Sequence, residues 1–241
     1  MRRLTDLTVK IFADGADVAG MVAMAKNPLV KGFTTNPSLM RKAGIADYES
    51  FAREVIAAIP DRPISFEIFA DEFAAMIAQG RKIGSWGPKV YVKVPVSDTA
   101  GRFSGAVISA LSREGIALNV TAIMTPDQVR AVAEALAPDV PAIVSVFAGR
   151  IADTGRDPAP HMRECVETLE FRPRAELLWA SSREVLNLFQ ADEIGCHVIT
   201  MTNDLIAKLA LCGRDLVEYS RDTVQTFFKD AAAAGYQLRI A

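Results

Sequence analysis

Residues 90–96 read Val-Tyr-Val-Lys-Val-Pro-Val, and this stretch decides the fold class. Four of these seven residues are valines, and a valine-rich apolar run of this kind is typical of a strand that is buried on both faces in a parallel sheet. A lysine inside such a strand is unusual, because burying an unpaired ammonium group is costly. Two interpretations are open: Lys93 points outward and extends its charged end between helices, or it faces an interior that uses its amine.

Seven further short apolar runs accompany this one, and Ala-rich segments with helical spacing separate them. The predicted strands are residues 8–13, 31–35, 63–69, 90–94, 117–122, 142–147, 176–180 and 197–201. Thr125 and Pro126 fit the cap and the first position of a helix, and Gly115 and Gly195 stand where helices should end. Eight strands that alternate with helices indicate an α/β protein with a (β/α)8 TIM barrel.

A doubly wound open sheet is the alternative architecture for such an alternation. It would carry a glycine-rich phosphate loop after the first strand, but residues 13–18 read Ala-Asp-Gly-Ala-Asp-Val and do not match GxGxxG. A chain of 241 residues, half of them apolar, is long enough for one large core. We therefore predict a single barrel domain over residues 1–241, in which residues 213–241 form an additional C-terminal helical extension.

The charge balance argues against several classes of partner. Lys and Arg total 27 and Asp and Glu total 29, with no polybasic run, so we expect no nucleic acid and no membrane surface as a partner. No apolar stretch approaches the ~18–20 residues of a membrane span, and no signal peptide is evident. Three cysteines without CxxC spacing fit reduced thiols in a cytoplasmic protein.

In a TIM barrel the active site lies at the C-terminal ends of the strands, and polar residues gather there in this sequence. A desolvated Lys93 amine would be a nucleophile that condenses with a ketone to form a Schiff base. Asp14 and Glu67 are two carboxyl groups that could divide the proton transfers of such chemistry. Asp14 could instead cap a helix, a role that Asp17 could also take, and Glu67 could be the charge partner of Lys93.

Arg150, Ser181 and Arg183 form a candidate anion site near the ends of the sixth and seventh strands. Two guanidinium groups and a hydroxyl suit a phosphate group. The alternative is that the arginines are surface residues paired with Asp153 or Glu184. His, Cys and carboxylate residues do not cluster in the sequence as metal ligands do, so we expect no metal.

Several of these segments resemble the transaldolase family, and the resemblance runs from about residue 10 to about residue 211. The matching motifs are residues 32–38 (GFTTNPS), 91–95 (YVKVP), 118–121 (LNVT), 145–150 (SVFAGR) and 180–183 (ASSR). The resemblance implies a TIM-barrel enzyme of carbohydrate metabolism, in the pentose phosphate pathway, that acts on sugar phosphates and needs no cofactor.

The resemblance also implies a role for each site residue. Lys93 would form the Schiff base with C2 of a ketose phosphate, sedoheptulose 7-phosphate or fructose 6-phosphate. Asp14 would take the C4 hydroxyl proton as the C3–C4 bond breaks, and the dihydroxyacetone unit left on Lys93 would attack an aldose phosphate. Glu67, with Thr121 and a water, would serve the dehydration and rehydration steps. The substrate-binding residues would be Thr35, Asn36, Ser38, Asn119, Ser145, Phe147, Arg150, Ser181 and Arg183.

Two positions bear on the subgroup. The family's fructose-6-phosphate aldolases carry Gln in place of Glu67 and Tyr in place of Phe147, so both residues favour a transaldolase. The sequence departs from the family after Asp14 and at residues 201–204, which leaves the exact sugar open. The alternatives are an aldolase that releases free dihydroxyacetone, a sugar-phosphate-binding barrel without catalysis, or a metal-dependent epimerase, which would need a His and carboxylate cluster.

The C-terminal extension predicts an assembly. Residues 213–241 include a helical stretch that a barrel does not need, and this stretch contains Phe227 and Phe228. The family resemblance suggests ring assemblies built with this helix. We therefore expect a homo-oligomer.

Overall fold

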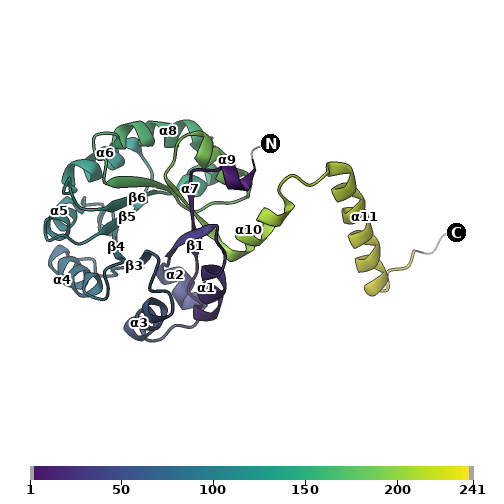
Figure 1. Cartoon of the computed structure of the whole chain (residues 1–241), viewed down its shortest axis with the longest axis horizontal. Coiled ribbons are helices and arrows are strands. Elements are labelled where there is room, and N and C mark those ends of the chain that lie inside the picture. Colours follow the sequence, from purple (N-terminus) through teal and green to yellow (C-terminus); the bar gives the residue numbers. More distant parts are fainter. Residues whose placement is uncertain (1–2, 239–241) are drawn as a thin grey trace. The chain divides into compact units, whose positions relative to one another are not determined.

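The computed structural model describes residues 3–238 and contains a closed barrel of eight parallel strands, seen end-on in Figure 1. Each strand pairs with the next one in the sequence, and the last pairs with the first. The predicted TIM barrel is therefore confirmed, and the ends of the predicted strands differ from the observed ones by at most two residues. The strands are β1 (Lys10–Asp14), β2 (Val30–Thr34), β3 (Ile64–Glu67), β4 (Val90–Pro95), β5 (Leu118–Ile123), β6 (Ala142–Val146), β7 (Ala175–Trp179) and β8 (Val198–Thr202).

Helices follow every strand, and two of the crossovers contain a pair of helices, β2 to β3 and β6 to β7. The predicted cap at Thr125 is present. The Thr125 hydroxyl accepts from the backbone N–H of Gln128, and the Gln128 side chain accepts from the backbone N–H of Thr125. Gly115 and Gly195 end helices with φ of 81° and 79°, a conformation that glycine adopts without strain. The helices of the barrel are α1 (Val18–Ala25), α2 (Pro37–Lys42), α3 (Tyr48–Ala58), α4 (Phe73–Gly84), α5 (Gly105–Arg113), α6 (Pro126–Ala135), α7 (Ala148–Asp153), α8 (Pro158–Leu169), α9 (Leu186–Glu193) and α10 (Asn203–Ala207).

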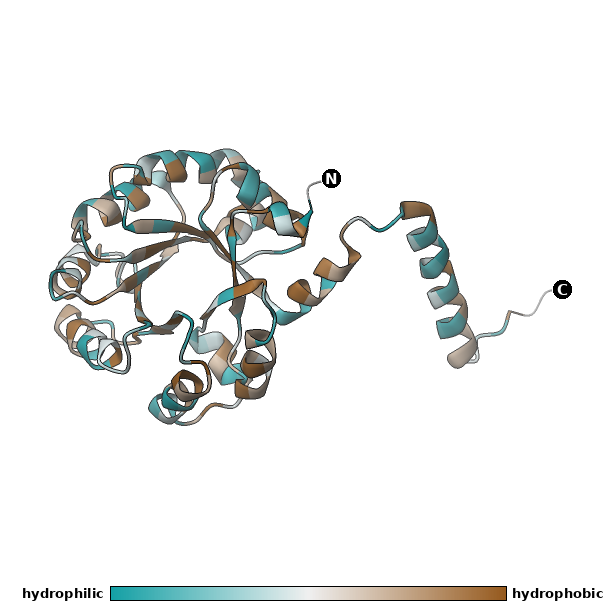
Figure 2. Ribbon diagram, in the orientation of Figure 1, coloured by the Kyte–Doolittle hydropathy of each residue, from teal (hydrophilic) through white to brown (hydrophobic). Residues whose placement is uncertain are grey.

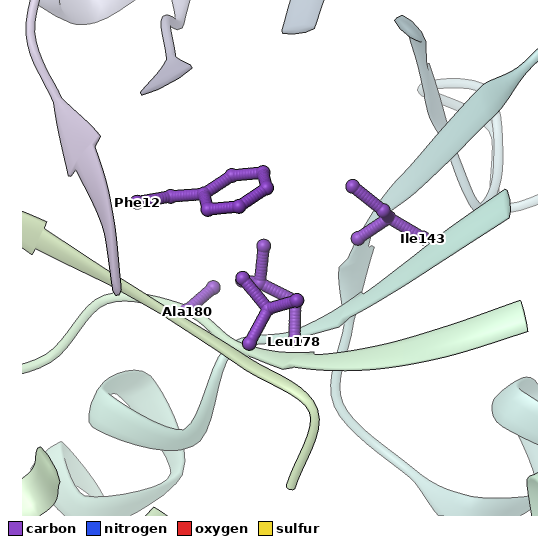
Figure 3. Packing of buried hydrophobic residues seen from close by; sticks show 5 residues of the cluster. Phe12, Ile143, Leu178 and Ala180 are labelled. Carbon is purple, nitrogen blue, oxygen red and sulfur yellow. The ribbon is translucent and has the colours of Figure 1, made fainter. Parts of the chain in front are cut away.

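The middle of the barrel is filled by side chains. Phe12 extends its ring from β1 toward Ile143 of β6 and Leu178 of β7 (Figure 3). Gly32 on β2 makes room for this ring, because a Cβ there would lie 2.6 Å from it. Asp14 follows Phe12 by two residues and so shares its inward face. The cluster around Phe12 therefore fills the barrel directly below the polar C-terminal ends of the strands.

The strands are apolar along most of their length, and the helices around them alternate between apolar and polar faces, as Figure 2 shows. Buried residues include nearly every position of β4, β5 and β6. Burial on both faces explains why these segments read as continuous apolar runs in the sequence. None of the helices formed by residues 3–238 is long and apolar enough to cross a membrane.

The chain divides into two compact units, and the barrel unit is Thr8–Ala207. The described residues of the other unit are 3–7 and 208–238. They include two short 3-10 helices, Leu4–Asp6 and Lys208–Leu211, and the long helix α11 (Leu216–Ala233). Asp215 caps α11 by accepting from two backbone N–H groups, so the predicted C-terminal helix is present. Residues 1–2 and 239–241, the ends of the predicted domain, lie outside the described residues.

Candidate active site

A cavity of about 560 Å³ opens at the C-terminal ends of the barrel strands. Every predicted site residue except Thr35 and Arg183 lines this cavity. It also holds residues that the sequence analysis had not singled out, among them Thr34, Lys42 and Thr200. The lining residues are Asp14, Thr34, Asn36, Pro37, Ser38, Leu39, Lys42, Glu67, Lys93, Asn119, Thr121, Ala122, Ser145, Phe147, Arg150, Leu178, Ala180, Ser181 and Thr200.

Lys93 faces the barrel interior and is 7% exposed, so its side chain does not extend outward between the helices. Its Nζ donates to the backbone oxygen of Thr35 at 2.9 Å and lies 3.2 Å from Oε2 of Glu67. Strand register explains the pairing with Glu67, because the two residues are partners across β3 and β4. The amine is therefore held between two oxygen atoms in the cavity, where it can meet a substrate carbonyl.

Asp14 is the second carboxyl group of the cavity. Thr34 Oγ1 donates to its Oδ1 at 2.8 Å. Desolvation raises the pKa of Asp14 above its ordinary value, although Lys93 and the Thr34 hydrogen bond act in the opposite direction. Asp17, and not Asp14, caps α1 by accepting from the backbone N–H of Gly20, which leaves the Asp14 carboxyl group free for the cavity.

Buried hydrogen bonds fix the amide of Asn119. Its Nδ2 donates to Ser65 Oγ at 3.0 Å, and its Oδ1 accepts from Ser145 Oγ at 2.6 Å. Thr121, two residues along the same strand, has a buried hydroxyl without a hydrogen-bond partner among the described residues. Such a group is a ready site for a bound water or a substrate hydroxyl.

The backbone beside the cavity adopts conformations that are rare for residues with side chains. Ala122 and Ser181 both have φ of 62° and both line the cavity. Positive φ in residues other than glycine gathers at functional sites, where the surrounding structure holds it in place. Gly149 in α7 packs directly on Ser181, since a Cβ at Gly149 would lie only 1.6 Å from the Ser181 carbonyl oxygen.

The predicted anion site is only partly assembled in the cavity. Arg150 and Ser181 line it, and the Arg150 guanidinium lies 5.1 Å from the centre of the Phe147 ring. Arg183 does not line it and forms a two-armed ion pair with Asp153, the arrangement given above as the alternative for this arginine. Lys42 adds a cation to the cavity wall.

Residues 35–38 contribute in different ways. Thr35 Oγ1 donates to the backbone oxygen of Ser65, so its side chain does not reach the cavity and only its carbonyl contacts Lys93. Asn36 lines the cavity and also caps α2 by accepting from Leu39 N at 2.9 Å. Ser38 lines the cavity as predicted. Within residues 3–238, no three His, Cys, Asp or Glu side chains are grouped as metal ligands.

The sequence analysis missed Thr34, Ser65, Lys42 and Thr200. Ser65 could have been found by counting, because it lies two residues before Glu67 on β3 and shares its face. No residue of established direction marked the inward faces of β2 and β8, so Thr34 and Thr200 needed the structure. Lys42 gave no comparable signal, since its direction depends on where the short helix α2 ends.

Comparison with known proteins identifies the family. Residues 11–239 match the family model described as "Transaldolase/Fructose-6-phosphate aldolase". The chain is 34% identical over 202 residues to a "Probable transaldolase" of Dehalococcoides mccartyi, covering 83% of this chain and 90% of that protein. It is 33% identical over 202 residues to "Probable transaldolase 2" of Listeria monocytogenes, covering 83% and 88%.

Solved structures share the barrel at low sequence identity. A dihydrodipicolinate synthase from Rhodopseudomonas palustris superposes with a TM-score of 0.55 at 17% identity, covering 92% of this chain and 79% of that one. A 3-hexulose-6-phosphate synthase from Salmonella typhimurium superposes with a TM-score of 0.55 at 14% identity, covering 83% and 91%. At these identities the likeness concerns the fold alone.

Proposed function

Because the chain belongs to the transaldolase/fructose-6-phosphate aldolase family, we propose that it is a transaldolase that works through a Schiff base on Lys93. It transfers a dihydroxyacetone unit from a ketose phosphate to an aldose phosphate. The observation that carries this proposal is the buried Lys93 amine, held in the cavity between the Thr35 carbonyl and the Glu67 carboxylate. A lysine at this position gives up most of its hydration, and a role as the nucleophile would explain why the chain bears that cost.

The first step joins the substrate to the protein. The Lys93 nitrogen attacks C2 of the ketose, and the resulting carbinolamine loses its hydroxyl group as water to give the protonated Schiff base. Glu67 lies 3.2 Å from the amine, within reach of both the nitrogen and the departing hydroxyl. The unpartnered Thr121 hydroxyl supports a role in holding the water that carries protons to and from Glu67.

Cleavage follows at the C3–C4 bond. Asp14 accepts the proton of the C4 hydroxyl, the first aldose phosphate leaves, and the electron pair of the broken bond moves toward the Schiff-base nitrogen. The raised pKa of Asp14 suits a general base, because a carboxylate that is poorly stabilised binds a proton more readily. The remaining three-carbon enamine attacks the aldehyde of the second aldose phosphate by the reverse route.

Polar side chains of the cavity suit the two ends of the substrate. Asn36, Asn119 and Ser145 offer an amide and hydroxyl wall for the three-carbon unit. Arg150 and Ser181 suit the phosphate, with Lys42 as a further cation. Arg183 would join them only by releasing Asp153.

A transfer assay tests the proposal and separates it from the aldolase alternative. The protein is incubated with fructose 6-phosphate, with and without erythrose 4-phosphate, and glyceraldehyde 3-phosphate is followed by a coupled reduction. We expect product only with the acceptor, and none from Lys93→Met. Steady release of free dihydroxyacetone without an acceptor would identify an aldolase instead. Saturable sugar-phosphate binding with no turnover of any donor would indicate a binding barrel.

We also propose that the protein is a homo-oligomer, as the C-terminal segment suggests. Helix α11 carries exposed apolar side chains, including Leu216, Val224, Phe227 and Phe228. Large exposed apolar side chains that follow one another on a helix are typical of a contact surface. Light scattering at micromolar concentration should give a multiple of the 26.1 kDa chain mass, and a single monomer mass would contradict the proposal. A cytoplasmic location remains a prediction, based on three cysteines that are all free thiols.

A further inference from the structure

Two threonine hydroxyls meet inside the barrel next to Asp14. Thr34 lies on β2 and Thr200 on β8, the two strands that pair with β1 on its two sides. Their Oγ1 atoms are 2.7 Å apart, and both side chains are buried. Since β2 and β8 do not pair with each other, this contact passes across the inner face of β1, the face that carries Asp14.

Only one order of donors satisfies these groups while Asp14 is ionised. A carboxylate can only accept, so Thr34 must donate its single hydroxyl proton to Asp14 Oδ1 at 2.8 Å. Thr34 then has no proton left for its neighbour, and Thr200 must donate to Thr34. The result is a chain of donation from Thr200 to Thr34 to Asp14, in which each bond polarises the next.

We infer that Thr200 is a positioning residue for Asp14, and that it acts through the hydroxyl of Thr34. The chain keeps Oδ1 as an acceptor and fixes the plane of the carboxyl group. The other oxygen, Oδ2, is then the one left to receive a proton. If a proton arrived at Oδ1 instead, both threonine hydroxyls would have to reverse their direction.

The consequence for catalysis rests on the proposed function. In that reaction the C4 hydroxyl proton moves to Oδ2, and the C4 oxygen keeps the O–H electron pair as the new carbonyl bond forms. The C3–C4 pair moves into the three-carbon unit and neutralises the positive Schiff-base nitrogen. A carboxyl group with a fixed orientation meets this proton in one geometry, which is the benefit that positioning gives to a proton transfer.

Other charged groups also face Asp14, and they stay constant when Thr200 is changed. Lys93 from β4 lowers the pKa of Asp14, and Glu67 from β3 raises it. Lys42 from α2 and Arg150 from α7 line the same cavity. Within residues 3–238 the Thr200 hydroxyl has no hydrogen bond other than the one to Thr34, so replacing it alters this chain alone.

The test measures the ionisation of Asp14 directly. Protein labelled with ¹³C in the aspartate carboxyl groups is titrated by NMR, and the Asp14 signal is assigned by its loss in Asp14→Asn. In Thr200→Val, which keeps the side-chain shape, the Asp14 midpoint should rise by about 0.5–1 pH unit, the size expected for one lost link of a hydrogen-bond chain. Thr200→Ser should restore the wild-type midpoint. Thr168→Val, which removes a buried hydroxyl of α8 from a bond to the Glu164 carbonyl, should leave it unchanged.

Kinetics supply the second readout. In the transfer assay, kcat of Thr200→Val should fall about three- to tenfold and its acid limb should move to higher pH, with KM little changed. If Thr200→Val does not fold, Thr200→Ala should show the same midpoint shift. An unchanged Asp14 midpoint in a folded Thr200 variant would overturn the inference, even with reduced activity. A wild-type protein without transfer activity would overturn the proposed function alone, because the NMR comparison does not depend on turnover.

Discussion

Gly149 is the position where a single methyl group should do the most damage to the site. A Cβ there would lie 1.6 Å from the carbonyl oxygen of Ser181 and 2.7 Å from its carbonyl carbon. Real Cβ contacts essentially never fall below 3.0 Å, so the two backbones must separate by about 1.4 Å. Neither side can give way by rotating a side chain, because the clash is with backbone atoms.

The cost follows from this displacement. Overpacking of a tight site costs about 1–3 kcal/mol, and each kcal/mol lowers Tm by about 2–4 °C in a chain of this size. We therefore expect Gly149→Ala to lower Tm by about 2–12 °C. Ser181 and Arg150 flank this contact and both line the cavity, so the phosphate end should lose its geometry. A misplacement of about 1 Å can reduce a rate about a hundredfold, and kcat/KM for phosphorylated sugars should fall by that order.

Calorimetry and the transfer assay measure the two effects, and Gly87→Ala is the matched control. A Cβ at Gly87 would meet Ile56 at an ordinary 3.5 Å, outside the cavity, so its Tm should stay within about 2 °C of wild type. A Gly149→Ala protein with the Tm and kcat/KM of the wild type would refute the reasoning. A stable protein with impaired kcat/KM would separate the effect on the phosphate end from the effect on folding.

Two further predictions concern charged groups. Burial raises the pKa of Asp14, so its ionised form destabilises the folded state; Asp14→Asn should therefore have a higher Tm than wild type at pH 7 while losing about 10²- to 10⁴-fold in transfer rate. This advantage in Tm should shrink as pH falls through the raised pKa and vanish below the ordinary value of 3.8, and a difference that grows toward low pH would contradict the direction of the shift. Arg150→Ala should raise KM for phosphorylated substrates at least tenfold, whereas Arg183→Ala should change it less than threefold, because Arg183 is held by Asp153 and does not line the cavity. Equal effects of the two arginine variants in steady-state kinetics would show that Arg183 moves into the site with substrate.

The sequence predicts the barrel because the same constraint repeats eight times. Each strand is covered on both faces, and this produces short β-branched runs whose spacing is visible without any structure. The paired helices of two crossovers escaped prediction for a physical reason. Helices α2 and α7 have six residues each, too few for a periodic apolar face. In the sequence, only the Asn36 cap and Pro37 indicate the start of α2, and α7 begins at Ala148 without a side-chain cap.

Alternation along the strands also accounts for most of the candidate site. Lys93, Glu67 and Asn119 line the cavity. The sequence alone had left the direction of Lys93 open, because a strand that is apolar on both faces does not show which face points inward. Thr35 follows the inward Thr34, so its side chain must point away from the cavity. The motif that suggested Thr35 as a substrate-binding residue does not show this direction. Arg183 lies beyond the end of β7 and after the positive φ of Ser181, where counting along a strand no longer applies.

The hydrogen bond between Thr34 and Thr200 depends on the register of β2 and β8 relative to β1, strands that are distant in sequence. Along β1, Thr34 is the register partner of Asp14, whereas Thr200 is the partner of Phe12. Nothing in either strand's own sequence fixes that offset. Contacts of this kind across the barrel therefore need the structure.

Borohydride trapping tests the central claim most directly. The protein is incubated with fructose 6-phosphate, reduced, weighed as an intact chain and digested to locate the added mass. A single sugar-derived adduct on Lys93, absent from Lys93→Met and retained in Lys42→Met, is the expected result. Lys42 is the proper control because it lines the same cavity. An adduct on Lys42 or another lysine, or transfer activity without any adduct, would contradict the assignment of Lys93 as the nucleophile.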